Sequence, residues 1–169
     1  MESGFKTGRN ESTLDDKGRV VIPSQFRERF AEDVKIVEGQ EQCVVKILQG
    51  KEQCVWVMTQ RSYAYFVKTV KNELIEKGVS EEIENFEYQH ESTAEDAKVD
   101  LKNGRIPIPS SLRAYANLSK DCLVVSIKGR LEIWNADYNK TFMEEVRLKN
   151  KATLSRIDGK VNYFLEEKA

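Results

Sequence analysis

The sequence predicts an α+β fold, mainly β, in which two tandem copies of one small unit form a pseudo-two-fold repeat. Three observations predict it: a motif that occurs twice, short β-branched runs bounded by turn residues, and an amphipathic stretch at the end of each copy. With 169 residues, 40% hydrophobic and 33% charged, the chain can bury one sizeable core or two small ones, as a globular protein does.

The repeated motif places a glycine and an arginine before a short apolar run that ends in proline. Residues 17–27, KGRVVIPSQFR, return 86 residues further on as NGRIPIPSSLR at 103–113. Glycine before arginine suits a tight turn, and the β-branched run predicts a short strand. Proline ends that strand because it cannot donate to a ladder. Each copy therefore opens with a turn and a strand.

A short helix is expected directly after each of these strands. Ser24 and Ser110 stand where a helix N-cap is expected. Apolar residues spaced four apart would bury one face of each helix, and these pairs are Phe26 with Phe30 and Leu112 with Ala116.

The remaining apolar runs predict strands and one closing helix in each copy. The strands are expected at 34–37, 43–47 and 54–58, and at 122–127 and 130–134. Thr59 is expected to cap the first helix and Gly78 to end it, while Asn135 is expected to cap the second. We assign Trp56 and Trp134 to the core. The apolar stripes of the two helices are Tyr63, Phe66, Val67, Val70 and Leu74, and then Tyr138, Phe142 and Val146.

These elements divide the chain into a first half at 5–78, an acidic linker at 79–97, a second half at 98–149 and a tail at 150–169. Charge marks the linker, because residues 81–96 carry seven acidic side chains and no lysine or arginine, whereas residues 98–113 carry four basic side chains and one acidic one. Its simplest role is a solvated connector. The tail contains an apolar run at 161–165 without a clear period, which leaves its structure open.

Composition argues against membrane, metal and enzyme functions. No run approaches the roughly 20 apolar residues of a membrane helix, and the polar start is no signal peptide, so we expect a cytoplasmic protein. Cys43, Cys54 and Cys122 lack ligand spacing and are expected to be reduced core residues. The lone His90 is expected to be solvated in the linker. No nucleophile, base and orienter combine, so we expect no enzyme activity, cofactor or small-molecule substrate.

The string at 12–27, the second motif at 104–113 and the run Leu131-Glu-Ile-Trp134 together resemble the MraZ family over roughly residues 5–148. The resemblance implies tandem AbrB-like swapped-hairpin β-barrel halves with short helices, and several chains closed into a ring. It also implies a nucleoid-associated transcriptional regulator that binds direct repeats of double-stranded DNA upstream of a bacterial division and cell-wall gene cluster. A net charge of -1 does not by itself favour nucleic acid.

The family marks its DNA-facing surface with an Asp-x-x-x-Arg signature in each half. In the first half the signature falls on Asp15 and Arg19. In the second half Arg105 is present, but Leu101 stands four places before it and Asp100 one place earlier. Because side chains alternate along a strand, this transposition would turn the carboxylate to the opposite face unless a bulge restores it.

Two interpretations of the arginines stay open at this point. A guanidinium fork matches two phosphate oxygens or the O6 and N7 edge of guanine, which favours DNA contact. Lys17 and Lys102 on the same turns would then contact phosphates, with Lys6 and Arg9 as further candidates. The alternative is that Asp and Arg only clamp a turn by a salt bridge.

The second recurring arginines, Arg27 and Arg113, are assigned a helix-end or inter-subunit role rather than DNA contact. A different class of function is also open: a self-assembling scaffold or protein-binding adaptor in which the repeat serves ring geometry alone. The nearly neutral charge slightly favours that alternative.

Overall fold

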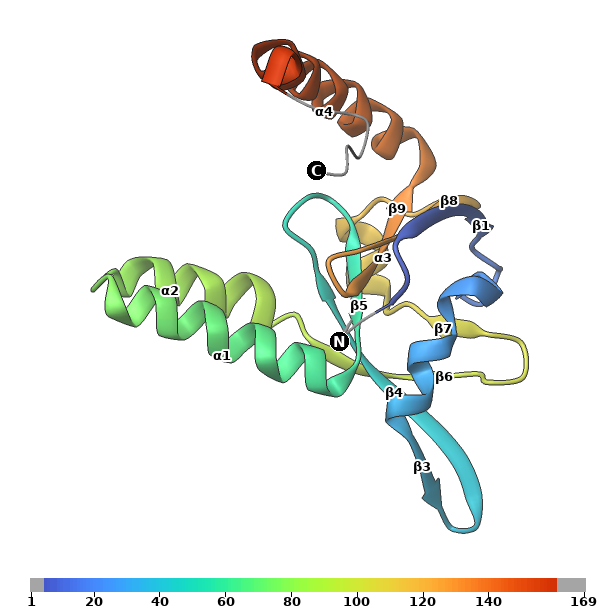
Figure 1. Ribbon diagram of the computed structural model, residues 1–169. Coiled ribbons are helices and arrows are strands. Elements are labelled where there is room, and N and C mark those ends of the chain that lie inside the picture. The colour runs from blue at the N-terminus through green and yellow to red at the C-terminus, as the bar shows by residue number, and fades with distance from the viewer. Residues whose placement is uncertain (1–4, 161–169) are drawn as a thin grey trace, which may run out of the picture. The chain divides into compact units, whose positions relative to one another are not determined.

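The computed structural model describes residues 5–160, in which the chain forms two compact units that meet at Ala136 and Asp137. The first unit holds a seven-stranded antiparallel sheet, a two-stranded ribbon and several helices (Figure 1). Its strands are β1 (Gly8–Thr13), β2 (Arg19–Val21), β3 (Val34–Val37), β4 (Gln40–Gln49), β5 (Val55–Met58), β6 (Glu95–Val99), β7 (Arg105–Pro107), β8 (Asp121–Ile127) and β9 (Arg130–Asn135). Its helices are the 3-10 segments η1 (Ser24–Phe26) and η2 (Glu28–Asp33), then α1 (Gln60–Glu76), α2 (Ser80–Phe86), the π-helical turn η3 (Glu87–Glu91) and α3 (Ser110–Tyr115).

The strand order shows how the two copies combine. Neighbouring strands follow the path β1-β8-β9-β5-β4, and β6 pairs with β4 at Cys43–Ile47. The corresponding strands of the two copies are β1 and β6, β4 and β8, and β5 and β9. If each strand is replaced by its counterpart, the order β1-β8-β9-β5-β4-β6 is the same order read in reverse. The first strand of each copy therefore joins the hairpin of the other: β1 lies beside β8, with Gly8 opposite Ser126, and β6 lies beside β4, with Val99 opposite Cys43 (Figure 1). The predicted α+β fold with swapped-hairpin halves is confirmed.

The repeated motifs meet in the separate ribbon of β2 and β7. The two strands are antiparallel, with Val20 opposite Ile106, and both side chains are fully buried. Pairing continues past the strand ends, because Ile22 N donates to Gly104 O at 2.8 Å and Ile108 N donates to Gly18 O at 2.9 Å. Each strand thus leads into the turn of the other copy.

One hydrophobic core serves both copies. The ribbon contributes Val20 and Ile106, and the sheet contributes strand residues from both hairpins, including Ile47 and Ile133. The predicted apolar pairs of the short helices, Phe26 with Phe30 and Leu112 with Ala116, are buried in this same cluster. Because each copy supplies only part of the lining, the separate halves would expose the inner faces of their strands to water.

The predicted strand runs and the first closing helix are confirmed. The five runs correspond to β3, β4, β5, β8 and β9. Thr59 caps α1, its Oγ1 accepting from Ser62 N at 3.2 Å, and Gly78 ends the helix with a φ of +68°. The predicted stripe on α1 is half-buried.

The expected serine caps are wrong. Pro23 and Pro109 occupy the N-cap positions of η1 and α3, and Ser24 and Ser110 are already helical, with no side-chain cap. Proline cannot cap with its side chain, but its fixed φ allows an abrupt change from strand to helix. The first copy also has two consecutive 3-10 helices where one short helix was expected.

The segment 79–97, expected as an acidic linker, contains α2, η3 and the first residues of β6. The expectation of a solvated His90 is wrong. Its ring stacks on Trp56 with centroids 5.4 Å apart and planes at 9°, and its Nδ1 lies 3.1 Å from Gln49 O. Phe86 of α2 is buried against the same ring, with centroids 5.2 Å apart. Aromatic packing therefore anchors this segment to the sheet.

The described part of the second unit begins at Asp137, the second residue of α4 (Ala136–Ile157), and ends with the 3-10 turn η4 (Asp158–Lys160). The helix continues past residue 149, so the first part of the expected tail is helical, while the apolar run 161–165 lies outside the described residues. Spacing by four places Tyr138, Phe142 and Val146 on one face of α4. Within residues 5–160, each helix is either too short or too polar to cross a membrane.

Candidate nucleic-acid interface

The first copy of the motif forms a turn closed by its own aspartate. Asp15 N donates to Arg19 O at 2.9 Å, and Gly18 N donates to Asp15 O at 3.0 Å. The Asp15 carboxylate adds two more bonds, its Oδ1 accepting from Lys17 N and Arg19 N at 2.9 Å each. Gly18 has a φ of +77°, in the left-handed region that favours glycine. The glycine and the aspartate are both needed for this turn.

Arg19 projects from the end of this turn, held by a salt bridge. Its Nε donates to Asp15 Oδ2 at 2.8 Å, and the two side chains are 28% and 34% exposed. Hydrogen bonds from Arg19, first its backbone N–H and then its guanidinium, lower the pKa of Asp15. Only Nε is engaged, so the two terminal amino groups of Arg19 have no hydrogen-bond acceptor among residues 5–160.

The second turn is one residue longer, and Asp100 takes the place of Asp15. Asp100 Oδ2 accepts from Arg105 Nε at 3.3 Å and Nη2 at 3.1 Å, while its Oδ1 accepts from Lys102 N at 3.1 Å. The Asn103 amide, followed by Arg105, lowers the pKa of Asp100 to about 2. The extra residue therefore restores the carboxylate–arginine pair that the transposition of Asp100 and Leu101 had put in doubt.

The ribbon brings the two arginines to one face. Arg19 lies opposite Pro107, and Arg105 lies opposite Val21, whereas the residues between them point into the core. Arg19 and Arg105 are therefore diagonal neighbours on the outer face, with Cα atoms roughly 7–8 Å apart.

Two lysines lie on the turns at the two ends of the ribbon. Lys17 and Lys102 are exposed on the two turns, and the antiparallel pairing sets those turns at opposite ends of the ribbon. We call this the arginine strip, defined as Lys17, Arg19, Arg105 and Lys102. The carboxylates of Asp15, Asp16 and Asp100 lie on the same turns, so the strip is only weakly cationic overall.

The two N-terminal candidates lie outside the ribbon and its two turns. Lys6 forms an ion pair with Glu28, its Nζ 3.7 Å from Oε2. Arg9 lies in β1 opposite Val125, three residues before Ser12, whose Oγ donates to Val21 O. Their part in DNA binding stays a separate prediction.

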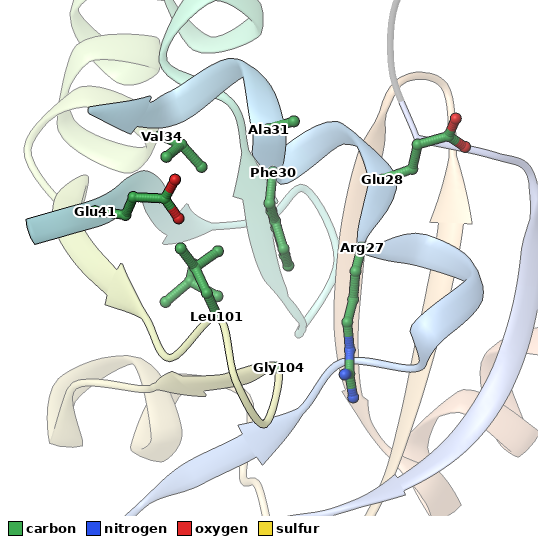
Figure 2. Close-up of a pocket in the computed structure, with 9 residues that line it drawn as sticks. Arg27, Glu28, Phe30, Ala31, Val34, Glu41, Leu101 and Gly104 are labelled. Atoms are coloured by element: carbon green, nitrogen blue, oxygen red, sulfur yellow. The ribbon is translucent and has the colours of Figure 1, made fainter. Parts of the chain in front are cut away.

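The arginines that recur at the end of the motif each contact a turn of the other copy. Arg27 Nε donates to Ile22 O at 2.6 Å, and an added Cβ on Gly104 would lie 2.1 Å from Arg27 Cζ. Likewise, an added Cβ on Gly18 would lie 2.1 Å from Arg113 Nη1. Figure 2 shows the Arg27 side chain extending to the loop that carries Gly104. Sequence reasoning missed this contact, although the constant spacing of glycine and arginine in both copies was a signal for it.

A pocket of about 320 Å³ opens beside the second turn (Figure 2). Its walls come from η2 and the residue before it, the β3–β4 hairpin, the end of β6 and the second turn, and are mostly apolar. The lining residues are Arg27, Glu28, Phe30, Ala31, Val34, Glu41, Val99, Leu101 and Gly104. Within the described chain, no group of three or more His, Cys, Asp or Glu side chains is placed to hold a metal ion.

Comparison with known proteins covers both copies. The family model of the MraZ protein matches residues 5–85 and 92–159. Transcriptional regulator MraZ of Ligilactobacillus salivarius is 33% identical over 138 residues, which are 82% of this chain and 86% of the relative. The protein of the same name from Paenarthrobacter aurescens is 30% identical over the same shares. The one from an Arthrobacter species is 29% identical over 152 residues, 90% of this chain and 96% of the relative. With both motifs matched and nearly the full length of these relatives covered, the chain belongs to the MraZ family.

Proposed function

We propose that this chain is a sequence-specific transcriptional regulator that acts in the cytoplasm at the nucleoid. It binds direct repeats of double-stranded DNA upstream of a bacterial division and cell-wall gene cluster, and it does so as a ring of identical chains. The regulator names of the relatives support the general role. The observation that carries the DNA contact is the arginine strip, in which two aspartate-clamped arginines share the outer face of a two-stranded ribbon.

The strip has a shape and chemistry suited to a DNA groove. The major groove, about 12 Å wide, admits a two-stranded β-ribbon. Arg19 is fixed through Nε, which leaves its terminal amino groups to donate to phosphate oxygens or to a guanine edge. Because the clamp limits the motion of the side chain before binding, less conformational entropy is lost in the complex. Clamp and DNA contact are therefore parts of one mechanism rather than alternatives. Lys17 and Lys102 add backbone contacts that fix register.

The proposal requires several chains on one DNA. A strip with four cations makes few phosphate contacts, which supports only weak binding at physiological salt. A ring raises the effective concentration of the second and third strips once the first is bound. Head-to-tail contacts present every strip in the same orientation, which matches direct repeats about 10 base pairs apart. Exposed apolar residues on the edge strand β3, Ile36 and Val37, support contact between chains.

The primary test is Arg19→Ala, with Arg61→Ala on α1 as the matched control. Both variants remove one exposed or half-exposed arginine, but only Arg19 belongs to the strip. We expect Arg19→Ala to weaken the mobility shift at least tenfold while the melting temperature stays close to that of the wild type, and Arg61→Ala to bind normally. A variant that melts much earlier while its folded fraction binds normally would show that Arg19 serves the fold alone.

A second test addresses the ring and the repeats. Duplexes carrying one box, three boxes at about 10 base pairs, and three boxes separated by an extra half turn of about 5 base pairs should differ, with tight binding only to the second. Equal binding to all three would contradict multivalent recognition. In sedimentation, a single species near 19.5 kDa at micromolar concentration would exclude the ring. Retention on heparin to several hundred millimolar salt, despite a pI near 6.0, separates this proposal from a scaffold without DNA binding.

A further inference from the structure

Each turn that carries a strip arginine is covered by an arginine from the other copy. An added Cβ at Gly18 or Gly104 would lie 2.1 Å from an atom of Arg113 or Arg27, so that arginine would have to move away from the turn. Both glycines also have positive φ, +77° and +68°. The guanidinium groups therefore rest directly on the turn backbone at the point where it adopts its least common conformation.

Both arginines are themselves anchored, so the contact is a fixed one. Arg27 Nε donates to Ile22 O at 2.6 Å, and Arg113 Nη1 donates to Ile108 O. The same two isoleucines hold the glycines through the backbone, since Ile22 N donates to Gly104 O and Ile108 N donates to Gly18 O. A backbone amide of one copy thus donates a hydrogen bond to a glycine of the other copy, and an arginine of the first copy contacts the same glycine.

The geometry points to Arg27 and Arg113 as positioning residues for DNA recognition that act crosswise: Arg113 holds the turn of Arg19, and Arg27 holds the turn of Arg105. Their importance for DNA rests on the proposed function, but the crosswise support of the turns does not. The Asp15 carboxylate can accept from both Lys17 N and Arg19 N only while Gly18 keeps its conformation. The contact of Arg113 with Gly18 therefore maintains the salt bridge between Asp15 and Arg19, and with it the direction in which Arg19 projects.

The second turn depends on its arginine in the same way. It is one residue longer than the first, and the pocket of about 320 Å³ lies along one side of it, with Arg27, Leu101 and Gly104 in its wall (Figure 2). Among residues 5–160, Arg27 lies against Gly104 beside this pocket, at the place where a Cβ on Gly104 would stand, so it limits movement of Gly104 on this side. We therefore expect Arg27 substitutions to loosen the second turn at least as much as Arg113 substitutions loosen the first.

Hydrogen exchange on the full chain tests the crosswise arrangement without DNA. Arg113→Met should raise amide exchange in residues 15–19 at least tenfold and leave residues 100–105 within about twofold of the wild type, and Arg27→Met should do the reverse. Arg→Lys at each position keeps charge and length but not the planar fork, so it should give the same crosswise pattern with smaller amplitude. If a methionine variant does not fold, the lysine variant at the same position tests the inference, because it should still raise amide exchange only in the turn of the other copy. Equal exchange in both turns, or no change in either, would overturn the inference.

DNA binding supplies the second readout, through pairs of substitutions. If Arg113 acts through Arg19, adding Arg113→Met to Arg19→Ala should weaken binding by less than about twofold more, whereas adding it to Arg105→Ala should weaken binding by its full single-variant factor. Additive losses with Arg19→Ala, together with near-normal binding of Arg113→Lys, would mean that Arg113 contacts DNA itself. A wild-type chain that binds no duplex would refute the proposed function, and the exchange pattern would still decide the crosswise support.

Discussion

Replacing Gly18 by alanine should destabilise the fold much more than the same change at Gly39. The two glycines have nearly equal φ angles, +77° and +78°, so both substitutions force alanine into the left-handed region. That strain costs about 1–2 kcal/mol at either site. At Gly39, in the turn between β3 and β4, an added Cβ meets nothing within 4 Å. Gly39→Ala therefore measures the backbone cost alone.

At Gly18 the added Cβ must also displace Arg113. The nearest atom is Arg113 Nη1 at 2.1 Å, and this is the group that donates to Ile108 O. Losing a hydrogen bond made by a charged group costs about 1.5–3 kcal/mol. The total for Gly18→Ala is then about 2.5–5 kcal/mol. For a chain of this length, the excess over Gly39→Ala corresponds to about 3–12 °C in melting temperature.

Urea unfolding followed by tryptophan fluorescence, at one fixed protein concentration, measures these free energies and keeps any self-association constant. In an Arg113→Ala background, Gly18→Ala should cost no more than Gly39→Ala does in the wild type, because the displaced group is gone. Equal costs at Gly18 and Gly39 in the wild type would refute the reasoning, since Arg113 would then leave the turn without penalty.

Three further expectations follow from burial. Leu112→Ala should lower the free energy of unfolding by about 2–5 kcal/mol, because its side chain is 1% exposed in the shared core, and a loss below 1 kcal/mol in urea unfolding would contradict that placement. Burial raises the pKa of the Cys43 and Cys122 thiols to about 11 and that of Cys54 further, so iodoacetamide at pH 8 should label the native protein slowly and the denatured protein fast; rapid native labelling would be the opposite result. Burial lowers the pKa of His90 below 6.5, so the unfolded chain binds more protons and stability falls as pH drops below 6.5 toward the folded pKa; His90→Gln should reduce this pH dependence, and an unchanged profile would argue against it.

The elements with apolar side chains were predictable, and a polar strand was not. The runs at 43–47 and 130–134 alternate or continue with apolar residues, which is how a half-buried or buried strand is recognised. β1 reads GRNEST and has no such pattern, because what holds it is backbone pairing with β8 and not burial of its own side chains. Pairing between distant segments leaves little trace in local composition.

The candidate site shows the same division. The repeat located Arg19, Arg105 and both turn glycines, since a motif that returns with constant spacing needs no knowledge of the fold. The repeat left the role of Asp100 open, because turn length decides whether a carboxylate faces its arginine. One added residue in the second turn brings Asp100 to the same side as Arg105. The contacts of Arg27 and Arg113 cross between the copies, so they became visible only once the strands had been paired.

His90 illustrates a third limit. Its acidic neighbours predicted a solvated ring, but stacking on Trp56 is decided by α2 and η3 packing against the sheet, which the charge pattern of the segment does not reveal.

The exchange of first strands between the copies has a consequence for the order of events during synthesis. β1 emerges from the ribosome first, but Thr13 pairs with Asp121, more than a hundred residues later. At about 5–20 residues per second, the strand waits on the order of 5–20 s for its partner to be made. A waiting strand with an open edge is an aggregation hazard, and an apolar one would be the worst case. The polar sequence of β1 suits this delay, because Arg9, Asn10 and Glu11 keep it solvated until the hairpin of β8 and β9 arrives to receive it.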